Sequence, residues 1–248
     1  VSKKIQQAKL LFQKAIVNNN YRGSYMYCYC TKSSHFRHIV EEALRNDIHL
    51  ETSSAFDMPM IDALEKKGIV NKDITVICNG FKTYQYKQYI IDMLHDGFRN
   101  IIPVLDNKEE FNIYDDELDI PCNLGIRIAA EEQPDSQFYT SRLGVRLEDV
   151  IDFYNNKIAS NPNFKVKLLH FFINSGISDT PYYWNELEKY VTLYCKFKKV
   201  NPDLTTLDIG GGMPFKDSLV FDFDYEYMVN EVVKGIKEIC AEHDGIEP

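Results

Sequence analysis

The segment Leu207-Asp208-Ile209-Gly210-Gly211-Gly212-Met213-Pro214 decides how the rest of the chain is interpreted. A short apolar run leads into three consecutive glycines, and an amphipathic helix is predicted to follow. Glycine has no Cβ, so three in succession permit a sharp turn and let backbone N–H groups approach an anion. After a strand in an α/β chain this loop is typical of a phosphate site, although an ordinary Gly-rich turn explains it equally well.

Short apolar runs alternate with amphipathic stretches along the chain. We expect a lead-in helix over residues 2–17 and then seven strands, at 25–29, 48–51, 75–78, 101–104, 124–128, 166–172 and 206–209. The helices between and after them are expected from Ser34, over 57–66, from about 84 to 95, near Lys108, over 147–158, from about 182 to 197 and over 225–242. This alternation of strand and helix predicts an α/β fold with a parallel sheet and right-handed crossovers.

Two α/β architectures fit this alternation. A doubly wound sheet is one, and a (β/α)8 TIM-type barrel is the other. The barrel is favoured because each unit leads directly into the next and no Gly-x-Gly-x-x-Gly fingerprint follows the first strand. The seventh unit ends close to Pro248. We therefore expect residues 1–248 to form one barrel domain, truncated before its eighth strand.

The composition narrows the class of partner. The chain has 248 residues, 44% of them hydrophobic and 26% charged, which is typical of a globular protein. A net charge of −9 argues against nucleic acid as the main partner. No apolar run reaches membrane-spanning length, and no signal-peptide pattern is present. The six cysteines form no Cys-x-x-Cys pair, so we expect a cytoplasmic protein with no structural metal.

Reactive side chains follow several of the predicted strands. Lys32 follows the first strand, Glu51 ends the second, Arg127 lies in the fifth, and Ser175 follows the sixth. Because active-site groups of a barrel sit at the carboxyl ends of its strands, we expect them at one mouth with Gly210–Gly212. A lone lysine is more often solvated than reactive, but a mouth lysine can form a Schiff base. A lysine together with an anion-binding loop is what pyridoxal phosphate requires.

A set of motifs carries a family resemblance. The chain resembles the fold-type III pyridoxal-phosphate decarboxylases, which share the alanine-racemase-like barrel and act on ornithine, arginine, diaminopimelate or carboxynorspermidine. The third of the motifs below resembles biosynthetic arginine decarboxylases in particular. The matching segments, in the family's order, are Tyr29-Cys30-Thr31-Lys32, Glu51-Thr52-Ser53-Ser54, Cys78-Asn79-Gly80-Phe81-Lys82, Arg127-Ile128-Ala129, Ser141-Arg142-Leu143-Gly144, Phe171-Phe172-Ile173-Asn174-Ser175-Gly176 and Leu207 to Pro214.

The resemblance implies roles for these residues. Lys32 would form the Schiff base with pyridoxal 5'-phosphate, while Ser175 and Gly210–Gly212 would hold its phosphate. Arg127 would help to orient the acidic group on the ring nitrogen, and Glu51 would support Lys32 and the ring. Each has a plainer alternative: a structural carboxylate for Glu51, an internal salt bridge for Arg127, and a helix cap for Ser175.

Two residues depart from the family pattern at the sixth strand. Phe172 stands where the family has a histidine that stacks on the cofactor ring, and a phenyl ring can stack but supplies no proton. His170 lies on the same strand face, nearer the barrel floor, and we expect a structural role for it. Asn174 replaces a glycine and tolerates a left-handed backbone.

The family resemblance implies decarboxylation of a small basic amino acid, with L-arginine giving agmatine for polyamine synthesis. The alternatives are another substrate of this family, a pyridoxal-phosphate carrier barrel, or a non-catalytic homologue. The family completes its site with a Glu-Pro-Gly-Arg motif on the eighth strand and a C-terminal β domain across a homodimer. Glu247-Pro248 is either the first half of that motif or precedes it. We therefore expect residues 1–248 alone to be inactive.

Overall fold

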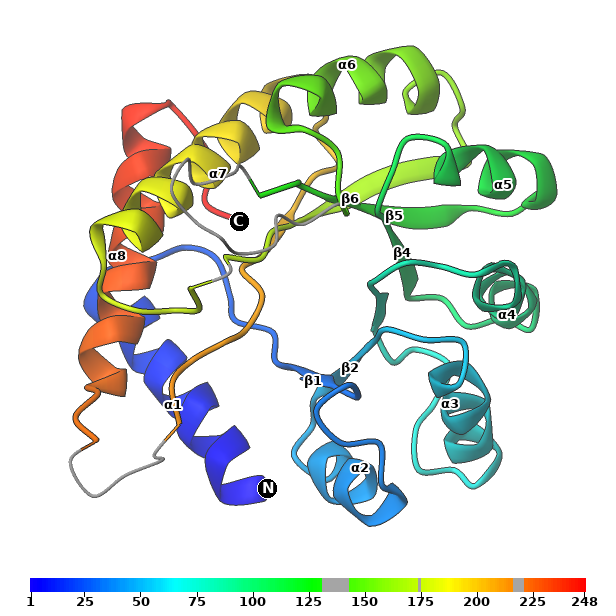
Figure 1. Ribbon diagram of the computed structural model, residues 1–248, viewed down its shortest axis with the longest axis horizontal. Helices are drawn as coiled ribbons and strands as arrows, with labels where there is room; N and C mark the ends of the chain where they lie inside the picture. Colours follow the sequence, from blue (N-terminus) through cyan, green and yellow to red (C-terminus); the bar gives the residue numbers. More distant parts are fainter. Residues whose placement is uncertain (131–142, 174, 216–220) are drawn as a thin grey trace.

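Seven parallel strands form one curled sheet in the computed structural model, which describes residues 1–130, 143–173, 175–215 and 221–248 (Figure 1). The strands lie in the order in which they occur along the chain, so each pairs with the next. Their bounds are β1 (Cys28–Cys30), β2 (His49–Thr52), β3 (Val76–Cys78), β4 (Ile101–Leu105), β5 (Cys122–Arg127), β6 (Phe164–His170) and β7 (Thr206–Asp208). Sequential order excludes the doubly wound alternative, in which strand order reverses part way across the sheet.

Helices cover the outside of the curled sheet (Figure 1). Most elements are α-helices: α1 (Ser2–Asn18), α2 (Arg37–Leu44), α3 (Asp57–Lys66), α4 (Tyr84–His95), α5 (Glu110–Glu117), α6 (Val150–Phe153), α7 (Pro181–Val200) and α8 (Tyr225–Glu242). The helix expected over 147–158 is divided into a 3₁₀ turn η1 (Leu147–Asp149), α6 and a π-helical turn η2 (Tyr154–Ile158). The bounds predicted for α3, α4 and α8 are confirmed.

Side-chain caps explain where three of the helices begin. The hydroxyl of Thr83 accepts a hydrogen bond from Tyr86 N–H at the start of α4, and Thr180 does the same for Tyr183 in α7. Asp224 caps α8 in the same way. Such caps satisfy backbone N–H groups that have no partner within the helix. The cap of α7 is therefore Thr180, and the interpretation of Ser175 as its cap is wrong.

The interior has two apolar layers on opposite faces of the sheet. The larger layer lies between the strands and the helices and includes Val76, Cys78 and Leu169. The smaller layer fills the concave side with Ile77, Val104 and Leu168, against which Cys28 and Ile102 pack. Alternate residues of a strand point to opposite faces of the sheet. A strand whose two faces are both buried therefore has a continuous apolar sequence. Polar side chains at the carboxyl ends of the strands lie above this inner layer.

The two ends of the described chain lie close together. Phe12 of α1 stacks on Tyr25 with ring centroids 3.8 Å apart, and it packs with Val229 and Val233 of α8. Tyr21 Oη donates a hydrogen bond of 2.8 Å to the Pro248 carbonyl. These contacts place Tyr25 outside the first strand, which was predicted at 25–29 and is found at Cys28–Cys30. No helix of the described residues is long and apolar enough to cross a membrane.

Candidate active site

The carboxyl ends of the strands meet in a single polar layer. Glu51 of β2 pairs in register with Cys30 of β1, and His170 of β6 pairs with both Arg127 of β5 and Asp208 of β7. Because all the strands are parallel, these residues, which lie at or next to the carboxyl ends of their strands, meet at the same edge of the sheet. The predicted gathering of Glu51, Arg127 and the strand before the glycines at one mouth is therefore what the fold produces.

Glu51 is partly buried and is hydrogen-bonded to the neighbouring strand end. Asn79, which follows β3, donates from Nδ2 to Glu51 Oε1 at 3.0 Å. Burial raises the pKa of the Glu51 carboxyl, and the negative charge of Asp208 adds to this effect. His170, Asn79 and Lys32 oppose it, but the net pKa lies above the usual value for glutamate. Glu51 therefore holds a proton more tightly than an exposed glutamate does.

His170 and Asp208 form a buried ion pair beside Glu51. His170 Nδ1 lies 2.9 Å from Asp208 Oδ2, and the two side chains are 6% and 20% exposed. Burial alone would raise the pKa of Asp208, but His170 and the Gly210 N–H outweigh it and lower that pKa. Burial alone would lower the pKa of His170, but Asp208 outweighs it and raises that pKa. Both shifts favour the charged pair.

Arg127 takes part in a second buried ion pair. Its Nη1 lies 3.7 Å from Oδ1 of Asp106, a fully buried carboxylate that follows β4. The Asp106 backbone N–H donates to Glu110 Oε2 at 3.1 Å. Glu110 in turn pairs with Lys82, whose Nζ also donates to the carbonyls of Gly80 and Val104. Arg127 thus forms an internal ion pair, which connects it to a buried network.

The glycine loop packs backbone against backbone with the loop after β6. Gly210 and Gly212 have φ of +68° and +98°, which side chains other than glycine rarely adopt. Ile177 N–H donates to the Gly212 carbonyl at 3.3 Å, and a Cβ on Gly176 would lie 2.5 Å from that oxygen. Within the described residues, Gly211 and Gly212 N–H donate to no protein acceptor, whereas Gly210 N–H donates to Asp208 Oδ1 at 2.9 Å.

The donor set of this loop fits a phosphate. Consecutive backbone N–H groups without Cβ atoms form an anion-binding concavity. A Cβ on Gly211 would meet nothing within 4 Å, so space remains beside this residue. Gly210 contributes to the turn through its positive φ. Its N–H does not point to the anion site, because it donates to Asp208.

Phe172 and Ser175 lie beside this loop, Lys32 follows β1 at the same edge of the sheet, and all three side chains face solvent. Lys32 lies in the turn after β1 and is exposed. Its positive charge opposes, but does not outweigh, the rise in the pKa of the Glu51 carboxyl that burial causes. Phe172 is 37% exposed, and its Cδ2 would lie 3.6 Å from a Cβ on Gly210. Ser175 is exposed, with Oγ 3.4 Å from the Gly176 carbonyl. An aromatic face and a hydroxyl therefore lie beside the anion-binding loop, and an amine lies at the same sheet edge.

Several partners in this layer were not predicted from sequence. Asp208 was predicted only as part of the glycine segment, and no role was predicted for Asp106, which directly follows β4. Lys82 was noted for its motif but not as the buried partner of Glu110. The position of Asp106 and Asp208 at strand ends was the available signal. The expectations for Ser141, Arg142 and Asn174 lie outside the described residues.

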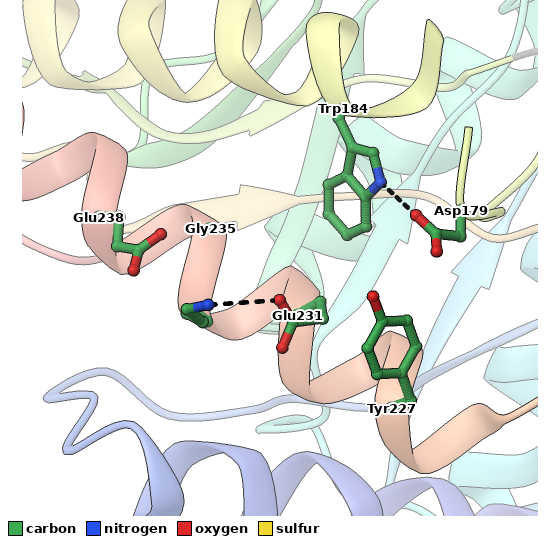
Figure 2. A pocket seen from close by; sticks show the side chains of 7 residues that line it. Asp179, Trp184, Tyr227, Glu231, Gly235 and Glu238 are labelled. Carbon is green, nitrogen blue, oxygen red and sulfur yellow. Dashed lines mark hydrogen bonds and ion pairs between the residues drawn. The ribbon is translucent and has the colours of Figure 1, made fainter. Parts of the chain in front are cut away.

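A surface pocket lies away from this layer. It has a volume of about 220 Å³ between α7 and α8, and Trp184 Nε1 donates to Asp179 Oδ1 at 2.7 Å on its rim (Figure 2). None of the strand-end residues lines it. Across the described residues, no group of three or more His, Cys, Asp or Glu side chains is arranged to hold a metal ion.

Comparison with known proteins places the chain in a family. Residues 3–247 match the family described as pyridoxal-dependent decarboxylase, pyridoxal binding domain. The chain belongs to this family, so the cofactor of its class is pyridoxal phosphate. That cofactor carries a phosphate and an aldehyde.

Relatives with given names add detail to this assignment. The chain is 26% identical over 256 residues to the biosynthetic arginine decarboxylase of Citrifermentans bemidjiense, covering 96% of this chain and 40% of that protein. The crystal structure of the biosynthetic arginine decarboxylase from Campylobacter jejuni has a TM-score of 0.77 at 20% identity, covering 100% of this chain and 42% of that one. A mutant of SrLDC in complex with PLP has a TM-score of 0.73 at 19% identity, covering 96% and 57%. The chain therefore spans less than half the length of these arginine decarboxylases.

Proposed function

We propose that the protein is a pyridoxal-phosphate-dependent decarboxylase that converts L-arginine to agmatine and CO2. The observation that carries this proposal is the meeting of Lys32, Glu51, Arg127 and the glycine loop at one sheet edge, in a chain of the pyridoxal-binding family. The similarity to biosynthetic arginine decarboxylases supports arginine as the substrate. Agmatine would then feed polyamine synthesis.

The residues of the site have separate roles in this proposal. Lys32 supplies the primary amine that binds the aldehyde carbon of the cofactor. The N–H groups of Gly211 and Gly212, with the hydroxyl of Ser175, hold the phosphate, while Gly210 shapes the turn. When bound, the cofactor supplies the electron sink that stabilises the carbanion left by departing CO2.

The charged strand ends set the electrostatics around the cofactor. Glu51, whose pKa is raised by burial, carries its negative charge less readily than an exposed glutamate, which limits its attraction for the Lys32 ammonium. Arg127 is fixed by Asp106 and helps to orient the acidic group that contacts the ring nitrogen. Phe172 covers one face of the ring, where an aromatic side chain contributes by stacking.

A second candidate is the same reaction on ornithine, diaminopimelate or carboxynorspermidine. A third is a homologue that binds the cofactor without catalysis, which the absence of a proton donor on Phe172 favours. We further propose that the strands are seven of a (β/α)8 alanine-racemase-like barrel, whose outer strands β1 and β7 would each pair with an eighth. A pyridoxal-phosphate-binding domain over 1–248, a homodimer and a cytoplasmic location complete this proposal.

Two measurements on the protein at its natural full length test the proposal. Borohydride reduction in the presence of pyridoxal phosphate should attach one phosphopyridoxyl group to Lys32, as located by peptide mass spectrometry. The Lys32→Ala variant should lose this label, and the exposed Lys66→Ala variant should keep it. Release of labelled CO2 from carboxyl-labelled arginine in excess of the other three substrates is the expected result.

Each alternative gives a different result in these assays. CO2 release from another amino acid would replace arginine as the substrate. Labelling of Lys32 without CO2 release from any of the four would support the non-catalytic homologue. Labelling of other lysines with none on Lys32 would contradict the assignment of this residue.

A further inference from the structure

Asp208 bridges His170 and the first glycine of the loop. Its Oδ2 lies 2.9 Å from His170 Nδ1, and its Oδ1 accepts a 2.9 Å hydrogen bond from the Gly210 N–H. One carboxylate thus connects a buried imidazole to the residue where the backbone turns toward Gly211 and Gly212. The imidazole itself lies below the loop at the end of β6.

We infer that His170 is a positioning residue, which holds Asp208 against Gly210 and thereby fixes the direction of the Gly211 and Gly212 N–H groups toward the cofactor phosphate. This inference rests on the proposed function. It goes beyond the structural role expected from sequence, because it gives His170 an effect on one part of the ligand, its phosphate.

The backbone on either side supports this arrangement. The His170 carbonyl accepts a hydrogen bond from Ile128 N–H at 2.8 Å, and the Asp208 carbonyl accepts one from Phe171 N–H at 3.1 Å. The main chains of β6 and β7 are therefore fixed before the loop begins. Gly210, at φ +68°, has no Cβ to restrict it, so the hydrogen bond to Asp208 restrains its orientation together with the packing against the loop after β6.

The charges around His170 explain why it is needed. The groups that face it are Asp208 from β7, Glu51 from β2 and Arg127 from β5. Without the imidazolium, Asp208 would be a partly buried carboxylate beside a second carboxyl, and Coulomb repulsion would favour turning it away from Glu51. Such a turn would break its hydrogen bond to Gly210.

The same charges should make phosphate binding depend on pH. Burial lowers the pKa of His170 and Arg127 does the same, but Asp208 and Glu51 outweigh them and raise it above 6.5. The charged pair is present below this raised pKa and is lost as pH rises through it. Phosphate binding should weaken over that range in the wild-type protein.

Two variants at His170 and one control separate this role from a general loss of stability. His170→Asn places an uncharged N–H donor near the position of Nδ1, and His170→Leu removes both donor and charge. His49→Asn changes a partly buried histidine at the start of β2, whose Nδ1 accepts a hydrogen bond from Thr75 N–H at 3.2 Å. The readout is the dissociation constant of pyridoxal phosphate and of pyridoxal, which has the aldehyde but no phosphate, as a function of pH.

His170→Leu should raise the dissociation constant of pyridoxal phosphate by about tenfold or more, since a hydrogen bond to a charged group is lost. Pyridoxal affinity should change by less than about twofold, as should both affinities in His49→Asn. His170→Asn should bind pyridoxal phosphate with intermediate affinity and without the wild-type loss at high pH. Should His170→Leu fail to fold, the pH profile of His170→Asn decides the matter.

Three outcomes would overturn the inference. Equal losses for pyridoxal and pyridoxal phosphate would assign His170 a general structural role, and unchanged affinities would assign it none. A His170→Asn profile with the wild-type slope would remove the charged pair from phosphate binding. If the wild-type protein binds neither ligand, the proposed function fails and the inference fails with it, whereas normal wild-type binding with unaffected variants overturns the inference alone.

Discussion

Lys82 Nζ lies 3.1 Å from Glu110 Oε1, and the two side chains are 0% and 3% exposed. Glu110 Oε2 also accepts the backbone N–H of Asp106, whose side chain pairs with Arg127. The pair therefore joins the segment after β3 to α5 and supports the carboxylate that holds Arg127. Removing one charge of a buried pair leaves the other without compensation.

Replacement of Lys82 by Met should lower the free energy of unfolding by about 3–5 kcal/mol, because it leaves the buried Glu110 carboxylate without a positively charged partner. The double variant Lys82→Met with Glu110→Gln should recover most of this loss, since glutamine keeps an acceptor for Asp106 without the charge. Urea denaturation measures both. Equal instability of the single and double variants would contradict the argument.

The control for this prediction is the exposed pair Lys66–Asp62, whose side chains are 69% and 36% exposed at an N–O distance of 2.6 Å. Exposed pairs are screened by water and contribute little, so Lys66→Met should change the free energy of unfolding by less than about 0.5 kcal/mol.

The glycines of the loop should respond differently to alanine. A Cβ on Gly212 would lie 3.1 Å from Gly176 Cα, and its φ of +98° strains any side chain. Gly211 has neither constraint. We expect Gly212→Ala to lower both stability and affinity for pyridoxal phosphate, with a stability cost of about 1–3 kcal/mol.

Gly211→Ala provides the comparison, since it should leave stability within about 0.5 kcal/mol and weaken only the binding of pyridoxal phosphate. Thermal unfolding and cofactor titration report the two effects separately. Full cofactor affinity in Gly211→Ala would show that the phosphate does not lie against this residue.

Sequence patterns predicted the alternation of elements well because each helix carries an apolar face with a period near 3.6 residues. The bounds of α4 and α8 matched for the further reason that Thr83 and Asp224 are capping residues at the predicted starts. The first strand was misplaced because Tyr25 reads as part of an apolar run. Its ring stacks on Phe12 of α1, and a contact between segments distant in sequence cannot be predicted from a local pattern.

The gathering of strand-end side chains was predictable from sequence, but the buried partners Asp106 and Lys82 and the pairing of the strand ends were not. Parallel strands bring their carboxyl ends together, which is enough to gather Glu51, Arg127 and Asp208. The pairing depends on register. Between Leu124 and Gly125 the register of β5 against β6 shifts by one residue, and this shift sets Arg127 opposite His170. Without it Arg127 would stand opposite Leu169, whose side chain packs toward the helices.

Phe172 should contribute to cofactor binding through its ring. Phe172→Leu removes the aromatic face while keeping an apolar side chain, so we expect pyridoxal phosphate affinity to fall by up to about tenfold, as expected for loss of a stacking contact. Phe81→Leu, at a ring that is 65% exposed after β3, is the matched control and should have no effect. Cofactor titration monitored by absorbance measures both, and similar affinities in the two variants would remove Phe172 from the cofactor face.

Glu51 should make the stability of the protein depend on pH in a specific direction. Burial and the nearby Asp208 raise its pKa above 4.5, so the folded state binds this proton more tightly than the unfolded chain does. The associated stability is fully present below the unfolded pKa and is lost as pH rises through the raised pKa. Glu51→Gln resembles the protonated side chain and can keep the hydrogen bond from Asn79.

The free energy of unfolding of Glu51→Gln, relative to the wild type, should therefore increase as pH rises from about 4 toward neutrality. Urea denaturation at several pH values gives this difference directly. Asp62→Asn, at a carboxylate that is 36% exposed, serves as the control and should show no such rise. A difference between Glu51→Gln and wild type that stays constant with pH, or falls, would mean that the fold does not raise the pKa of the Glu51 carboxyl.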